Sequence, residues 1–362
     1  MKQIYKFMIC SVMAAFVMVG QAFAQFNPEV KAGFFLITDM QATQDGFGSS
    51  SLVDDSYDWG YSASASRMRL SSSFKMTDRD LIVLSGEFSY VFGSGIPATS
   101  NIKLLDVRYD HKFADWLTLS VGRMTVSYNR NGYQGAGALA VNSFGYYQYT
   151  TTAVMQNIVA RDVGVNFRGT IIEDRLRYRL GVFRGRQDFE AEGTAPPRVT
   201  GRLQYDMFDE DRYEGSNFGE GKTLTFAFGA ETQSSYFTLS ADSYLDMACG
   251  SAGSIVFCTA YGYMNAGSAN SKYSFTPYME DHMTYLAEFG YYFTKTKLQP
   301  WVRFEMLDRL NRSSADEFVY GAGLSYFPRG YRTNIKASYV VRENTLVGKR
   351  YGQAGLQLVV AM

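Results

Sequence analysis

The residues best suited to do chemistry in this sequence are arginines spaced two apart. Arg175, Arg177 and Arg179 are each separated by one apolar residue. Successive side chains of a β-strand point to opposite faces, so this spacing puts three guanidinium groups on one face. In a confined aqueous channel such groups attract anions and bind carboxylates or phosphates through paired hydrogen bonds. The full set of candidate channel-lining residues is Arg168, Arg175, Arg177, Arg179, Arg198 and Arg202.

Acidic residues fall on the same predicted face and leave two interpretations open. If the basic row is unopposed, the channel prefers anions. If carboxylates lie across from it, the channel has one basic and one acidic wall. The acidic residues concerned are Glu87, Asp106, Asp110, Asp162, Asp242, Glu288 and Glu305.

Residues for catalysis are scarce. A barrel hydrolase needs a His activated by a neighbouring acid, together with a nucleophile or a bound water. The two histidines are His111, expected in a solvated turn, and His282, expected in a surface charge cluster. The sequence holds no Cys/His metal spacing, no P-loop and no GxGxxG before a helix. We therefore expect neither an enzyme nor a metal or cofactor site.

Two cysteines remain once the N-terminal segment is set aside. A tight turn at 250–253 would place Cys249 opposite residue 254, which puts Cys258 beyond disulfide range. If 248–260 is instead an irregular loop, the two can pair. Both alternatives stay open.

The first 24 residues are predicted to be a cleaved signal peptide. Lys2 and Lys6 form a basic start, residues 7–20 are apolar, and Ala22 and Ala24 fit an A-x-A cleavage site. The remaining domain, 25–362, has no second apolar run near the roughly 18–20 residues that a membrane-spanning helix needs. With 35 basic and 35 acidic residues and 16% aromatics, the chain is neither a nucleic-acid binder nor disordered.

The elements that must position these arginines are strands, because apolar residues recur with period 2 along the chain. A soluble sandwich and a membrane barrel both give this pattern. Aromatic residues near strand ends, a face rich in Gly, Ser, Thr and charges, and strands of about 10–13 residues favour the membrane barrel. The predicted fold class is therefore all-β, a transmembrane antiparallel β-barrel.

Sixteen strands are expected, and an even number places both termini on the periplasmic side. Residues 39–60, 129–160 and 265–281 are expected to be outer loops. Within 209–260 the pattern is weak, and a count of 14 or 18 stays open. The predicted spans are 28–38, 61–76, 81–93, 101–113, 117–128, 161–173, 175–187, 198–208, 222–233, 235–247, 254–264, 282–293, 297–307, 317–327, 332–342 and 350–362.

The longest connection, 129–160, is expected to fold into the barrel and narrow it. Its candidate constriction residues are Arg130, Tyr133, Tyr146 and Tyr147. The alternative is an outward loop that caps the barrel or contacts neighbours.

The segments 161–185, 197–203 and 297–305 resemble the phosphate-selective porin O/P family of bacterial outer-membrane porins. They contain the runs RDVGV, LRYRLGVFRG, PRVTGRL and KLQPWVRFE. The resemblance implies a sixteen-stranded, trimeric porin with a basic lumen and an infolded third loop. Two features depart from the family: the loop 129–160 has Arg130 as its one basic residue, and the chain ends in Met362.

The sequence thus predicts a porin of the bacterial outer membrane that contacts outer-membrane lipid. It would form a homotrimer and pass small hydrophilic or anionic solutes, with a modest anion preference. The alternative is a structural or adhesive outer-membrane barrel with surface-binding loops and a plugged lumen.

Overall fold

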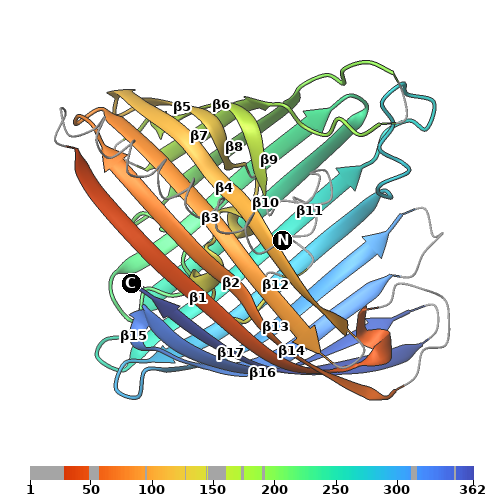
Figure 1. Cartoon of the computed structure of the whole chain (residues 1–362). Helices are drawn as coiled ribbons and strands as arrows, with labels where there is room; N and C mark the ends of the chain where they lie inside the picture. The colour runs from red at the N-terminus through yellow and green to blue at the C-terminus, as the bar shows by residue number, and fades with distance from the viewer. Residues whose placement is uncertain are drawn as a thin grey trace, which may run out of the picture.

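The computed structural model describes residues 28–48, 57–93, 96–126, 128–143, 145, 160–172, 175–189, 192–310, 316–345 and 348–362. Sixteen strands form one closed antiparallel barrel, in which β1 pairs with both β2 and β17 (Figure 1). This confirms the predicted all-β barrel and its strand number. No helix in the described ranges is long and apolar enough to cross a membrane. The predicted signal peptide, 1–24, lies outside the described residues.

The bounds of the barrel strands follow. They are β1 Glu29–Gln44, β2 Trp59–Lys75, β3 Asp80–Gly93, β4 Ile96–Ala114, β5 Leu117–Thr125, β6 Arg161–Thr170, β7 Leu176–Phe183, β8 Arg198–Asp206, β9 Lys222–Gln233, β10 Tyr236–Ala248, β11 Gly253–Asn265, β12 His282–Phe293, β13 Leu298–Arg309, β14 Glu317–Tyr326, β16 Thr333–Asn344 and β17 Lys349–Ala361. The short β15, Pro328–Tyr331, lies in the connection between β14 and β16. The helical turns are η1 Asp45–Gly48, α2 Arg130–Tyr133 and η2 Ala136–Ala138.

The barrel has two unlike ends. At the end where β1 begins and β17 finishes, here called the terminal end, most connections are short turns. The opposite end, here called the loop end, carries the long connection between β5 and β6. The region 209–260, where the sequence pattern was weak, keeps this order. There, β9 and β10 are joined at the loop end by Ser234 and Ser235, as the sixteen-strand count required.

The first strand is longer than predicted. Its pairing with β2 continues to Gln44 opposite Trp59, so the first loop begins after residue 44 rather than at 39. The register shifts between Ile37 and Asp39. The extra residue lies on β2, between Ser64 and Arg67, and such a bulge moves the side chains that follow it in β2 onto the other face.

The outer face of the barrel is apolar. Exposed large hydrophobic side chains occur on nearly every strand, and a soluble monomer rarely exposes so continuous an apolar surface. Examples from five strands are Tyr61, Ile102, Leu180, Phe228 and Val302. This surface suits the apolar surroundings of a bilayer, as the sequence pattern predicted.

Candidate functional site

The described part of the β5–β6 connection, residues 128–143, lies inside the barrel and is called the inward loop here. Its first residues are fixed to β8 and β10: the carbonyl oxygen of Tyr128 accepts hydrogen bonds from Arg202 Nη1 at 3.1 Å and Ser240 Oγ at 2.9 Å. The Asn129 side chain then caps α2 by accepting from the amide of Gly132 at 2.8 Å. The loop thus starts its path at one wall.

The inward loop ends against the other side of the barrel. Arg303 Nη1 on β13 donates to the carbonyl oxygen of Ser143 at 2.9 Å. Gln357 Nε2 on β17 donates to the carbonyl oxygen of Asn142 at 3.2 Å. The loop therefore crosses the interior, as expected of a constriction. Tyr146 and Tyr147 lie outside the described residues.

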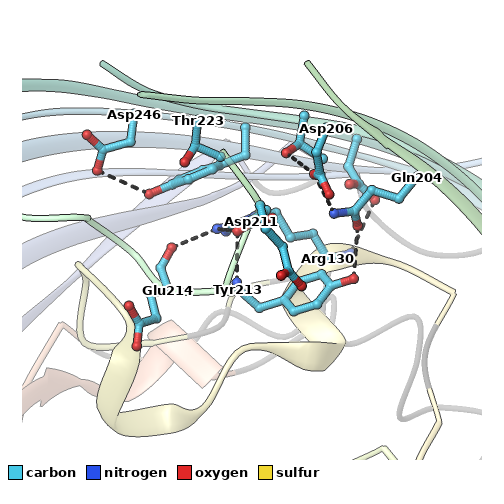
Figure 2. A network of polar contacts seen from close by, with 12 residues as sticks. Arg130, Gln204, Asp206, Asp211, Tyr213, Glu214, Thr223 and Asp246 are labelled. Carbon is cyan, nitrogen blue, oxygen red and sulfur yellow. Dashed lines mark hydrogen bonds and ion pairs between the residues drawn. The ribbon is translucent and has the colours of Figure 1, made fainter. Parts of the chain in front are cut away.

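A second segment enters the barrel from the terminal end. Residues 207–221, which join β8 to β9 and are called the inward turn here, meet the inward loop at Arg130 (Figure 2). The guanidinium of Arg130 contacts both carboxylate oxygens of Asp211, at 2.7 and 2.9 Å, and donates to the carbonyl oxygen of Glu214 at 2.7 Å. Both side chains of the ion pair are 1% exposed. Sequence reasoning did not find this contact, because it gave 209–221 only as the connection between the predicted strands 198–208 and 222–233.

The inward turn is packed as well as hydrogen-bonded. The amide of Gly215 donates to the carbonyl oxygen of Ala138 at 2.7 Å, and a Cβ at position 215 would lie 2.2 Å from the amide nitrogen of Ala140. Only glycine fits this approach of two backbones. Further along, Phe218 packs on Tyr331 with ring centroids 4.7 Å apart. The two inward segments form one partition across the interior.

The strands behind this partition have an inner face that is buried. The apolar side chains of Leu286 and Trp301 there are 2% and 3% exposed, and Arg198 and Lys336 are fully buried. We call the inner faces of β8–β17 at the level of this partition the packed wall. Toward the loop end, Arg309 on β13 and Arg342 on β16 are 15% and 13% exposed. The inward loop covers the predicted inner face on this side of the barrel, where Trp301 packs against Leu139 and Val141 of the loop.

The inner faces of β2–β7 differ, and we call them the arginine wall. They carry guanidinium groups that remain partly exposed, and most of these pair with carboxylates. Its arginines include Arg67, Arg69, Arg108, Arg161, Arg168, Arg177 and Arg179.

In three ion pairs of the arginine wall the guanidinium is much more exposed than its carboxylate. The exposed side-chain fractions are 19% and 4% for Arg69 and Glu87, and 27% and 5% for Arg168 and Asp110. Arg177 is 14% exposed and its partner Asp206 is 1% exposed. The carboxylates lie against the wall and the arginines cover them, so the surface presented to the interior is cationic. A second partner of Arg177, the exposed Glu210 on the inward turn, is the exception.

The six predicted channel-lining arginines divide between these regions. Arg168, Arg177 and Arg179 lie on the arginine wall. Arg198 is buried against Glu231, and Arg202 holds Asp242 through two contacts of 2.7 and 2.8 Å. The remaining residue, Arg175, precedes β7, is exposed and donates to the carbonyl oxygen of Met207 at 3.2 Å.

The sequence prediction missed Arg69, Arg108 and Arg161. Arg108 lies two residues from both Asp106 and Asp110 and therefore on the same inward face of the strand, so the same alternation could have found it. Arg69 follows a register shift between residues 65 and 68, which hid its face. The acidic residues pair with arginines of their own strand or of strands one or two places away in the barrel, so they do not form a separate acidic wall.

The histidines and cysteines take part in local contacts. His111 is on β4, with Nδ1 2.7 Å from Asp80, rather than in a turn. His282 is 4% exposed and so is not a surface residue, because it begins β12 on the inner face. Cys249 and Cys258 are unpaired, and a tight turn puts Ala248 opposite Ser254. Among the residues that the structure describes, no group of three or more His, Cys, Asp or Glu side chains could hold a metal ion.

Comparison with known proteins identifies the architecture. The chain superposes on the anion-selective porin from Comamonas acidovorans with a TM-score of 0.60 and 9% identity, covering 93% of this chain and 100% of that one. The fold is that of an outer-membrane porin. OmpF of Salmonella typhi, in complex with daunomycin, gives a TM-score of 0.59 at 12% identity, covering 93% and 99%. The outer membrane channel DcaP of Acinetobacter baumannii gives a TM-score of 0.58 at 13% identity, and the match covers 92% of this chain and 97% of that one.

No family model and no curated protein sequence matches the chain. The resemblance to the phosphate-selective porin O/P family is therefore not confirmed. Because these sequence identities are low, the structural similarity supports the fold and no further property of the chain.

Proposed function

We propose that the protein is a porin whose solutes pass along the arginine wall. The observation that carries this proposal is the contrast in exposure between the two sides of the interior. On the arginine wall, Arg108 and Arg168 are 25% and 27% exposed, whereas Arg198 and Arg303 on the packed wall are 0% and 6% exposed. Water and small hydrophilic solutes have room beside the former and not beside the latter.

The proposed channel has a modest preference for anions. Its inner surface shows guanidinium groups in front of their carboxylates, and Asp110 serves both Arg108 and Arg168. A confined aqueous passage focuses this positive field, which raises the local anion concentration.

The proposed location is the bacterial outer membrane, reached by export and removal of residues 1–24. A homotrimer is the proposed assembly, since small outward residues such as Gly169, Ala322 and Ala337 allow close approach of walls. Crosslinking in mild detergent should trap a trimer. A strictly monomeric mass by native spectrometry at micromolar protein would contradict this part.

Planar-bilayer recording of the refolded protein tests the channel itself. We expect discrete conductance steps and, in a salt gradient, a reversal potential displaced toward the anion equilibrium potential. The displacement should shrink from 0.01 M to 1 M salt, because the Debye length falls from about 30 to 3 Å.

The partition supports one other function, a structural or adhesive barrel with a plugged lumen. The observation that favours a plugged lumen is the buried ion pair between Arg130 and Asp211, which joins the two inward segments. A plugged barrel would insert into bilayers without conductance steps. The same recording therefore separates the two candidates.

A further inference from the structure

Three arginines lie directly opposite one another on three neighbouring strands. The register pairs Arg168 of β6 with Arg179 of β7, and Arg179 with Arg202 of β8. All three side chains point inward, where they contact Asp110, Tyr133 and Asp242 respectively. Like charges directly opposite in adjacent strands destabilise a sheet. The row therefore needs negative charge to offset it.

The two outer members of the row have that charge. Arg168 Nη2 lies 2.9 Å from Asp110, and Arg202 holds Asp242 through both nitrogens. Within the described part of the chain, no carboxylate lies within ion-pair distance of Arg179. The central cation of the row thus has less negative charge beside it than its neighbours.

Two tyrosines border Arg179 instead. Its Cζ lies 4.3 Å from the ring centroid of Tyr133, on the inward loop, and 5.8 Å from that of Tyr213, on the inward turn. The rings are themselves 5.3 Å apart. Tyr213 also shares a side-chain hydrogen bond with Arg179. Ring contacts engage the face of a guanidinium, so the other donors on its planar edge are left for a ligand. The side chain is partly exposed, so a solute can reach it.

We propose that Arg179 is a binding site for the carboxylate of a small organic acid, placed where the inward loop and the inward turn meet the arginine wall. A planar carboxylate matches the edge of the guanidinium through two parallel hydrogen bonds. It also supplies the negative charge that the arginine row lacks at its centre. The site rests on the proposed channel only in that the solute must enter the interior.

Titration calorimetry on the detergent-solubilised full-length barrel tests the site without requiring conductance. The probe is benzoate in about 10 mM salt, where screening is weak, and benzamide is the uncharged control. We expect benzoate to bind the unmodified protein and benzamide not to bind. Arg179→Gln should weaken benzoate binding by about tenfold or more, as expected for a charged, paired hydrogen bond. Arg179→Lys should lie between, because an ammonium lacks the planar fork.

Arg350→Gln is the control, since Arg350 is an exposed arginine with a carboxylate partner, Glu343, and lies on β17, away from the arginine wall. It should change benzoate affinity by less than about threefold, as for a screened surface charge. Equal benzoate affinity in Arg179→Gln and the unmodified protein would overturn the site. Phosphate binding that depends on Arg179 and exceeds benzoate binding would overturn the carboxylate assignment. Benzoate binding to a barrel without conductance would contradict the proposed function and leave the site standing.

Discussion

The arginine wall and the packed wall are built from the same kind of strand, but their charged side chains have different roles. On the arginine wall, charged side chains such as Arg168 keep contact with the interior, and their carboxylates lie behind them. On the packed wall, charged side chains such as Arg303 are covered by the inward loop and satisfy its carbonyl groups. The difference shows that the position of a charge on the inner face does not determine its role. An arginine that the inward segments cover stabilises the structure, and an arginine that they leave exposed can contact solute.

The largest effect should come from breaking the partition that creates this difference. Asp211→Asn leaves the Arg130 guanidinium buried without its anionic partner, and removal of one member of a buried pair costs about 3–5 kcal/mol. We expect the inward turn to separate from the inward loop. Urea unfolding in detergent should show the loss of stability, and single-channel conductance should rise.

Glu220→Gln is the control for this change. Glu220 is an exposed carboxylate on the same inward turn, and a surface substitution of this kind stays within about 0.5 kcal/mol. If Asp211→Asn proved as stable and as conductive as the control, the two inward segments would not be held together by this pair.

A paired substitution then tests whether the two walls differ in role. Arg168→Gln should move the reversal potential toward cations with little change in unfolding, because Arg108 still neutralises Asp110. Arg303→Gln should lower the free energy of unfolding, because it removes the ion pairs of Arg303 with the buried Glu305 and the partly buried Glu288, and it should move the reversal potential less. Reversal potentials in a salt gradient and urea unfolding measure both. An equal shift in both variants would remove the distinction between the walls.

The smallest expected effect is a pH dependence of the partition. Burial raises the pKa of Glu214, on the inward turn, above its ordinary value of 4.5. A raised carboxyl pKa means that the native state binds its proton more tightly than the unfolded chain does. Stability should therefore fall as pH rises from about 4.5 through the raised pKa.

Glu214→Gln should remove this component of the pH dependence, and Glu220→Gln should keep it. Unfolding measured between pH 4 and 7 compares the three proteins. A pH dependence that Glu214→Gln leaves unchanged would assign it to another group.

Much of the barrel could be predicted from the sequence because strand alternation is a local signal. The strand number and the apolar outer face followed from it, whereas the inward loop was expected because 129–160 is the longest connection. The inward turn could not be predicted, because the contact of Asp211 with Arg130 joins residues that are 81 positions apart. No local pattern distinguishes a connection that folds inward from one that stays outside.

The channel-lining residues were predicted in part for the same reason. Alternation placed Arg198 and Arg202 on the inner face, and both contact inner-face carboxylates. Their burial depends on Glu231, Asp242 and the inward loop, which alternation does not report. Arg69 was missed because the register shift in β2 changes which face it occupies.

The most direct test of the solute path is cysteine accessibility on the two walls. In a Cys249→Ser background, which removes the exposed thiol, Arg108→Cys places a thiol on the arginine wall. Gln299→Cys places one on the packed wall, where the native side chain is fully buried. An anionic methanethiosulfonate applied during bilayer recording should modify position 108 quickly and change the current, while position 299 stays unmodified. Equal or faster modification at position 299 would contradict a path along the arginine wall.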